Sequence, residues 1–205
     1  MKYVICILIG YFFGCINFAY IIGRLKGFDI RNTGSGNAGV SNVTVALGWK
    51  LGIITAALDI LKGYLAALVC ATIFPDFPLG LYIGGASAVI GHIFPFYMQF
   101  KGGKGFASYI GFSMAIDWRI TIIICILTIV ITIVTDYIAL ATISSTFVMP
   151  GYLLVNHRWW YGQLAILVLL MIVMIYKHRI NIKRIVNHEE IGLRHVNKHR
   201  VELKQ

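Results

Sequence analysis

Long apolar stretches, each long enough to cross a lipid bilayer once, run through this sequence and restrict the folds open to it. The first covers residues 3–23 and contains no charged side chain. A helix rises 1.5 Å per residue, so about 20 such residues span the hydrocarbon core. Inside lipid, backbone polar groups must bond within their own segment, which favours helices. The sequence therefore predicts an all-α polytopic membrane protein.

Further apolar stretches indicate seven transmembrane helices in all. With 59% hydrophobic and 13% charged residues, the composition excludes an ordinary soluble domain. No polar linker divides the chain, so residues 1–205 are expected to form one domain, ending in a basic tail at 178–205. The second to seventh spans are expected at about 51–74, 80–98, 106–116 (short for a crossing), 120–134, 138–155 (kinked at Pro150–Gly151) and 161–176, with an aromatic belt at 156–160 before the last.

The net charge of +10 sits beside these spans, which argues against nucleic acid as a partner. Seven spans place 14 of the 18 lysines and arginines on one side of the membrane. By the positive-inside rule that side is cytoplasmic. It carries the loops 24–50 and 99–105 and the C-terminal tail. The cysteines lie in apolar stretches without paired spacing, so neither a metal site nor a disulfide is expected.

A polar loop at residues 31–42, Arg-Asn-Thr-Gly-Ser-Gly-Asn-Ala-Gly-Val-Ser-Asn, follows the first span. Its glycines can adopt φ > 0 and let backbone N–H groups approach a ligand. A helix that starts after such a loop directs its N-terminus at an anion. The alternative is a flexible turn between helices. Read as a phosphate cradle, the loop contributes Arg31, Gly34, Ser35, Gly36, Asn37, Gly39 and Asn42.

A second glycine-rich loop, Lys101-Gly-Gly-Lys-Gly105, follows the third span. Lysines among glycines at a membrane edge favour a phosphate site, here with Gly102, Gly103 and Lys104. The spacing is not that of a nucleotide-binding P-loop. A positively charged membrane anchor remains the alternative.

Two further groups of polar residues lie within or at the end of a span. Asp59 and Lys62 share one face of the second span, either as a functional pair or as a mutually neutralising structural pair. His178 and Asn181 are three residues apart where the last span meets water, so one helix face should hold both. They emerge on the same side as the two glycine loops, which favours a role in the site.

Five motifs occur in order along the chain, and together they resemble the bacterial acyl-phosphate-dependent glycerol-3-phosphate acyltransferases, the PlsY family. They are Gly34-Ser-Gly-Asn-x-Gly39, Asp59-x-x-Lys-Gly63, Gly91-His92, Lys101-Gly-Gly-Lys-Gly105 and His178-Arg-x-Asn-Ile182. The resemblance implies a seven-span enzyme of the bacterial cell membrane with a cytoplasm-facing active site. It implies acyl transfer from acyl phosphate to the 1-hydroxyl of glycerol 3-phosphate, giving lysophosphatidic acid and phosphate, without a metal or other cofactor.

The resemblance also implies roles for single residues. Catalysis is expected from Ser35, Lys104, His178 and Asn181, with His178 as the base for the acceptor hydroxyl and Asn181 orienting it. A phosphate oxygen of the substrate is the alternative base. Acyl phosphate is already activated, so no covalent nucleophile is required. Lys62, Arg184 and Glu190 match further polar positions of the family, and Lys62 and Glu190 are expected to help bind substrate. The expected partners are the two substrates and membrane lipids, and the protein is expected to be a monomer.

Several positions depart from the family pattern. Val45 stands where the family has arginine, and Asp136 and Ala139 replace an arginine and a serine of the turn after the fifth span. These losses keep an alternative open, in which the chain is a lipid-binding or transport paralogue with altered or no activity. Hydrolysis of acyl phosphate is a second enzymatic alternative.

Overall fold

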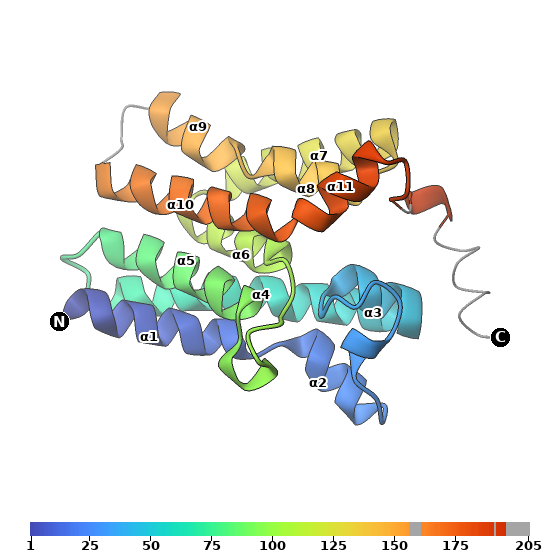
Figure 1. Cartoon of the computed structure of the whole chain (residues 1–205). Helices are drawn as coiled ribbons and strands as arrows, with labels where there is room; N and C mark the ends of the chain where they lie inside the picture. Colours follow the sequence, from blue (N-terminus) through green and yellow to red (C-terminus); the bar gives the residue numbers. More distant parts are fainter. Residues whose placement is uncertain (156–160, 191, 196–205) are drawn as a thin grey trace.

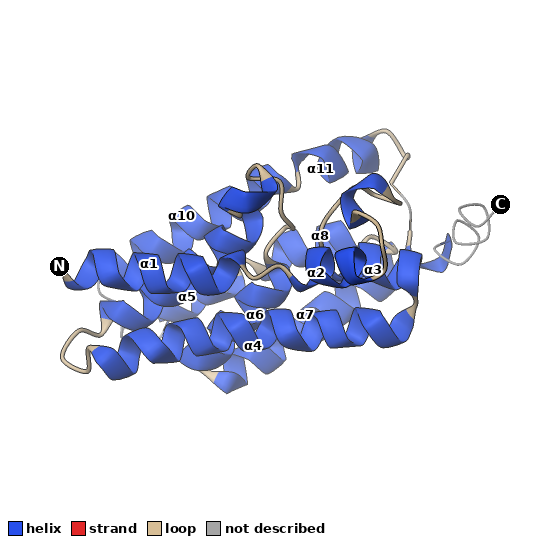
Figure 2. Cartoon of the chain, turned by 90° about the horizontal axis from the view of Figure 1, so that it is seen from below, coloured by secondary structure: helices blue, strands red, loops and turns tan. Residues whose placement is uncertain are grey.

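The structure, a computed structural model, describes residues 1–155, 161–190 and 192–195. Within these ranges all regular secondary structure is helical, and Figure 2 shows helices joined by loops without a strand. The aromatic belt expected at 156–160 and the tail beyond residue 195 lie outside the described residues. The prediction of an all-α protein is confirmed.

The long helices lie roughly along one direction in two layers with α6 between them (Figure 1). One layer holds α1 (Lys2–Cys15), α4 (Trp49–Ile73) and α5 (Leu79–Ile93). The other holds α7 (Trp118–Thr135), α8 (Ile138–Ser145), α9 (Val148–Val155) and α10 (Tyr161–Lys177), while α6 spans Phe106–Ile116. The N-terminus lies at the end of the bundle away from α3 (Val40–Leu47) and α11 (Arg179–Val186) (Figure 1).

Five helical segments among the described residues are long and apolar enough to cross a membrane. They are Lys2–Leu25, Trp49–Ile73, Leu79–Met98, Trp118–Thr135 and Ile138–Val155. A sixth crossing follows if α10 and α11 (Arg179–Val186), which meet at a bend of 53°, form one span. The predicted fourth span, α6, is a shorter apolar helix of 11 residues. The chain is thus a multi-pass membrane protein, and the count of seven crossings stays a prediction.

The central helix is α5, which packs against α1, α4, α6 and α10. Glycines allow these helices to approach closely, as expected for membrane helices. A Cβ atom at Gly14 of α1 would overlap the carbonyl oxygen of Ala88 in α5. One at Gly111 of α6 would overlap the carbonyl oxygen of Ile60 in α4. The helix faces turned outward carry large apolar side chains, for example Ile126, Ile129 and Ile133 of α7, and these face lipid.

The first predicted span is interrupted rather than continuous. It breaks after Cys15, and α2 (Phe18–Leu25) begins with the side chain of Asn17 accepting a hydrogen bond from the amide of Tyr20. The sixth span is interrupted at Thr146 and Phe147 rather than at Pro150–Gly151, where the kink was expected. The proline ring conflicts with the carbonyl four residues earlier, which places the break upstream of Pro150.

Short elements gather at the end of the bundle away from the N-terminus (Figure 1). They are η1 (Ile30–Asn32), α3 (Val40–Leu47), α11 and η3 (Leu193–His195). Another short element, η2 (Phe96–Met98), follows α5. The turn between α7 and α8 is tight because Asp136 adopts the left-handed conformation, with φ 67°. Its carboxylate Oδ1 accepts a hydrogen bond from the amide of Arg194, which attaches the tail to this turn.

Candidate active site

A cavity of about 650 Å³ opens where the two glycine loops meet the end of the last span. Its walls come from the loop 34–39, the start of α3, the segment 104–107, α8 and α11. The two glycine loops and the end of the last span, which were expected on the same side of the membrane, therefore meet at one cavity. Nine of the predicted site residues line the cavity: Gly34, Ser35, Asn37, Gly39, Asn42, Lys104, His178, Asn181 and Glu190.

Two helix N-termini open onto this cavity. Gly39, the N-cap of α3, and Val40 and Ser41 in its first turn are lining residues. Gly105, the N-cap of α6, and the next two residues, 106 and 107, line it as well. The first amides of a helix have no partner within the helix, and the helix dipole gives this end a partial positive charge. The cavity thus offers two places suited to an anion.

Asn42 fixes the shape of the first glycine loop. Its amide Nδ2 donates to the carbonyl oxygens of Ile30 and Thr33 at 2.9 and 3.0 Å, and its Oδ1 accepts from the amide of Ser35 at 3.1 Å. Gly34 has φ 54°, and a Cβ atom there would overlap Asn42 Oδ1. The side chain of Asn42 therefore stabilises the loop conformation. The side chain of Ser35 is exposed at the cavity.

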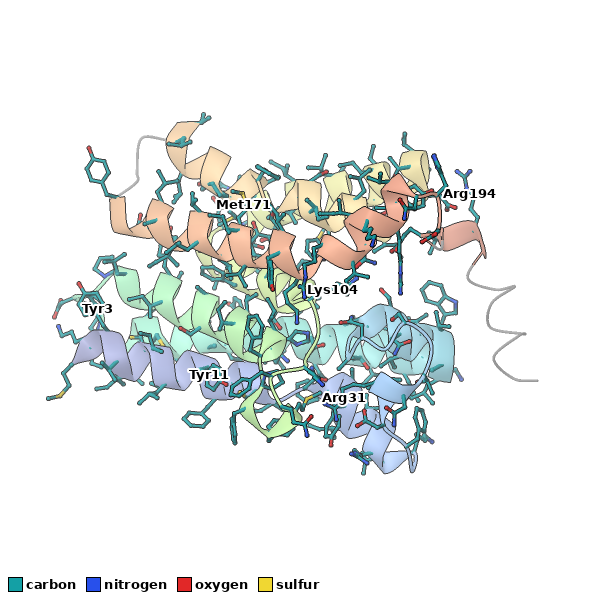
Figure 3. The ribbon with its side chains drawn as sticks, viewed as in Figure 1. Tyr3, Tyr11, Arg31, Lys104, Met171 and Arg194 are labelled. Carbon is teal, nitrogen blue, oxygen red and sulfur yellow. The ribbon has the colours of Figure 1, made fainter. Side chains whose placement is uncertain are left out.

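Lys104 connects the second glycine loop to α11. Its Nζ donates to Asn181 Oδ1 at 2.6 Å, and Asn181 Nδ2 donates to Glu190 Oε1. The orientation of the Asn181 amide follows, because an ammonium only donates and a carboxylate only accepts. Burial lowers the pKa of Lys104 to about 8, with Arg184 and Lys177 adding to the shift and Glu190 opposing it. Figure 3 shows Lys104 between the two helix layers.

His178 is held by contacts other than the one expected. Its Nδ1 donates to the carbonyl oxygen of Met174 at 2.8 Å, and its Nε2 lies 3.1 Å from the hydroxyl of Thr142. That hydroxyl also bonds the carbonyl oxygen of Ala139, at 2.9 Å. Since a carbonyl oxygen only accepts, Nδ1 carries the hydrogen of the neutral imidazole, and Nε2 keeps a lone pair beside the Thr142 hydroxyl. Thr142 and Met174, rather than Asn181, thus orient the imidazole.

Two predicted site residues of the first loop lie outside the cavity lining, namely Arg31 and Gly36. The Arg31 guanidinium bonds Asp29 Oδ2 at 2.7 Å and the carbonyl oxygen of Met98 at 2.9 Å. Figure 3 shows it apart from Lys104. Hydrogen bonding to Arg31 holds the pKa of the Asp29 carboxyl below its usual range. In the described structure the charge of Arg31 is therefore neutralised by Asp29, two residues before it.

Three further predicted site residues lie outside the cavity lining, namely Lys62, Gly102 and Gly103. Lys62 Nζ forms a buried ion pair with Asp59 Oδ1 at 2.7 Å and contacts His92 Nδ1 at 2.9 Å. The structural pairing of Asp59 with Lys62 is therefore present. The amides of Gly102 and Gly103 donate to the carbonyl oxygens of Ile93 and His92, both at 3.1 Å. These amides fasten the second loop to the end of α5.

Some lining residues were not assigned to the site from the sequence. Asp59 and His92 belong to two of the five motifs, so the sequence could have assigned them to the site. Thr142 and Glu189 belong to no motif, so nothing in the sequence assigned them to it. Val45 and Ala139, two departures from the family pattern, line the cavity as well, and Arg184 brings a positive charge to it. Among the described residues no group of three or more histidine, cysteine or acidic side chains could hold a metal ion.

Comparison with known proteins gives one family. The family described as Glycerol-3-phosphate acyltransferase matches residues 4–188. A protein of Oceanobacillus iheyensis named Glycerol-3-phosphate acyltransferase 1 is 40% identical over 202 residues, covering 94% of this chain and 96% of that protein. The Glycerol-3-phosphate acyltransferase of Aquifex aeolicus is 35% identical over 190 residues, covering 93% and 98%.

Solved structures agree with this result. A crystal structure of PlsY, an integral membrane glycerol 3-phosphate acyltransferase in its glycerol 3-phosphate form, superposes with a TM-score of 0.87 at 33% identity. It covers 94% of this chain and 96% of that one. The lysophosphatidic acid form of PlsY superposes with a TM-score of 0.85 at 32% identity, covering 94% and 95%.

Proposed function

This chain belongs to the glycerol-3-phosphate acyltransferase family, and on that premise we propose that it makes lysophosphatidic acid from acyl phosphate and glycerol 3-phosphate. Both substrates carry a phosphate group, and one carries a long acyl chain. The cavity is suited to this pair because its lining combines two helix N-termini with apolar side chains such as Ile60, Phe106 and Ile138. No second function is favoured by an observation in this structure.

One observation carries the proposal: the N-termini of α3 and α6 open onto the same cavity, with Lys104 beside the second. Each N-terminus offers unpaired amides to one phosphate group. Holding the two substrates together in a reactive geometry can contribute about 7–11 kcal/mol to catalysis. Lys104, Arg184 and the helix dipoles offset the repulsion between the two anions.

The chemistry needs one proton acceptor and one stabiliser of negative charge. The oxygen of the acceptor 1-hydroxyl forms a bond to the acyl carbon, and the bond from that carbon to the phosphate oxygen breaks. His178, which lines the cavity, accepts the hydroxyl proton at Nε2, the nitrogen left without a hydrogen because Nδ1 donates to Met174. Lys104 neutralises the charge that grows on the leaving phosphate, while Asn181 and Glu190 position its ammonium.

The membrane arrangement completes the proposal. The side that carries the glycine loops and α11 is rich in lysine and arginine, which supports a cytoplasmic orientation. Soluble glycerol 3-phosphate then enters from the cytoplasm, and the acyl phosphate enters sideways from the bilayer. The Ser35 hydroxyl, exposed at the cavity, donates to one of the two phosphates. The chain carries out these steps as a monomer, because every residue named lies in one copy.

The test is a reconstitution of the purified protein with palmitoyl phosphate and glycerol 3-phosphate. We expect lysophosphatidic acid and phosphate to form together, and only when both substrates are present. Phosphate release without the lipid would identify a hydrolase, and folded protein that forms neither product would refute the proposal.

Two lysines of the same loop provide a matched pair of variants. Lys104→Ala should abolish acyl transfer without unfolding the protein, because it removes the ammonium that faces the cavity. Lys101→Ala removes an exposed charge outside the lining and should retain normal turnover. Equal activity of the two variants would contradict the role given to Lys104.

A further inference from the structure

Three buried polar residues at and behind the cavity wall have no part in the steps above. Asp59 and Lys62 of α4 and His92 of α5 are 0%, 3% and 4% exposed at their side chains. Burying such a cluster inside a membrane protein is costly, so it is retained where it serves the site. Asp59 and His92 line the cavity, whereas Lys62 lies behind them.

The Lys62 ammonium has three polar neighbours. It donates to the carbonyl oxygen of Ile16 at 2.7 Å, contacts His92 Nδ1 at 2.9 Å and forms an ion pair with Asp59 Oδ1 at 2.7 Å. Asp59 keeps Lys62 charged, because a neutral lysine would leave a buried carboxylate without a counter-charge. Lys62 is thus held inside the protein, outside the cavity lining.

The contact with Lys62 fixes the protonation of His92. Lys62 Nζ lies 2.9 Å from His92 Nδ1, whereas Asp59 Oδ1 lies 3.5 Å from it. An ammonium can only donate, so His92 Nδ1 accepts in the shorter contact and carries no hydrogen. A doubly protonated imidazole would set two cations against the single carboxylate of Asp59. The remaining form is the neutral imidazole with its hydrogen on Nε2.

The Nε2 edge of His92 lies against Gly103 of the second glycine loop. A Cβ atom at Gly103 would overlap Nε2, so only glycine leaves this nitrogen uncovered. Among the residues that the structure describes, none accepts a hydrogen bond from Nε2. The imidazole is thus a donor without an acceptor, next to the loop that carries Lys104.

We propose that His92 Nε2–H is a substrate contact: it donates a hydrogen bond to an oxygen of the phosphate group held at the Gly103–Gly105 loop. Lys62 and Asp59 are the positioning residues that fix the required tautomer. The inference rests on the proposed function only for the identity of the anion. It assigns to Lys62 an indirect part in binding, in place of the direct contact expected from the sequence.

Nitrogen NMR of the full-length protein in detergent, labelled with ¹⁵N-histidine, tests the tautomer without a variant. His92→Gln identifies the signal of His92 among the six histidines. We expect the Nε2–H tautomer, and a shift of its Nε2 signal on addition of glycerol 3-phosphate or inorganic phosphate but not of glycerol. The Nδ1–H tautomer, or an Nε2 signal unmoved when the ³¹P line shows bound phosphate, would overturn the proposal.

Two amide substitutions separate a substrate contact from a packing role. The Gln amide can place its N–H₂ near the position of Nε2, whereas Asn reaches only the position of Nδ1. His92→Gln should therefore stay within a few-fold of normal kcat/KM, and His92→Asn should lose roughly tenfold to a hundredfold, the range expected for a lost bond to a charged group. Equal losses in both variants, at equal melting temperatures, would contradict the proposal.

The two hypotheses fail in distinguishable ways. If the wild-type protein forms no lysophosphatidic acid but inorganic phosphate shifts the His92 signal, the proposed function is wrong and the anion contact stands. If lysophosphatidic acid forms while His92→Asn keeps normal kcat/KM, the proposed function stands and the contact is wrong. Absence of bound phosphate in the ³¹P spectrum, together with no lipid product, overturns both.

Discussion

Lys104 Nζ and Asn181 Oδ1 are 2.6 Å apart, and this hydrogen bond joins a loop near the middle of the chain to the helix that follows the last span. Asn181 accepts from one N–H group of the ammonium, and the remaining N–H groups are available to a ligand in the cavity. Burial lowers the pKa of Lys104 to about 8, so its charge changes within the range in which such an enzyme is assayed.

The pH dependence of kcat/KM should follow this lysine. The protonated form of Lys104 binds phosphate, and this form is lost from the free enzyme as the pH rises through the pKa of about 8. We expect kcat/KM for glycerol 3-phosphate to be level just below that pH and to fall by roughly tenfold per unit above it. Initial rates in buffers of constant ionic strength measure this profile.

Lys104→Arg is the control for that assignment. Arginine stays protonated throughout this range, so the fall above pH 8 should disappear even if the overall rate is lower. A fall of the same shape in the arginine variant would assign the titration to another group.

Asn42→Ala should loosen the first glycine loop. The change removes hydrogen bonds to Ser35, Ile30 and Thr33. We expect a loss of about 1–3 kcal/mol in the free energy of unfolding, together with a higher KM for a phosphate substrate. Thermal unfolding in detergent and steady-state kinetics measure the two effects. Asn32→Ala, at an exposed position of η1, should change neither; equal losses would show that the loop does not depend on Asn42.

The sequence predicts part of the site, because the number of membrane spans determines on which side of the membrane each loop lies. Counting spans placed residues 34–42, 101–105 and 178–181 on one side, and the structure brings them around one cavity. The pairing of Asp59 with Lys62 also followed from their helical spacing. These features depend on periodicity and local spacing, which a sequence displays directly.

Other features depend on where helices break. The spacing of His178 and Asn181 predicted one shared face, but α10 ends at Lys177 and α11 begins at Arg179 after a bend of 53°. His178 lies at the bend as the N-cap of α11, and Asn181, within α11, contacts Lys104 instead. The break before α2, at Ile16 and Asn17, contains neither glycine nor proline, so the sequence gives no signal for it. In the structure the carbonyl oxygen of Ile16 accepts a hydrogen bond from Lys62.

Gly111→Ala should destabilise the bundle where α4 and α6 cross. The new methyl group would overlap the carbonyl oxygen of Ile60, so the helices must separate. We expect a cost of roughly 1–3 kcal/mol, measured by thermal unfolding in detergent. Gly151→Ala is the matched control, because nothing lies within 4 Å of its added Cβ atom in α9. Equal destabilisation by both changes would argue against close packing at Gly111.

Asp136→Ala should release the tail from the turn between α7 and α8. The substitution removes the acceptor of the Arg194 amide and the ion-pair partner of its guanidinium, which lies 3.9 Å away. We expect hydrogen exchange at the Arg194 amide to accelerate several-fold, as for one exposed hydrogen bond. Asp76→Ala, on the exposed turn before α5, should leave that amide unchanged. Unaltered exchange in Asp136→Ala would show that the tail is held by other contacts.

The bond from Lys62 to Ile16 also bears on the order in which the membrane helices assemble. The second span can enter the bilayer with Asp59 and Lys62 already paired within one helix. The other two acceptors of Lys62 come from the interrupted first span and from His92 at the end of the third. The ammonium is fully coordinated only after all three helices have docked, so the first three spans are completed as one unit. The cavity, whose second loop is fastened to the end of that third helix, therefore depends on the docking of these three spans.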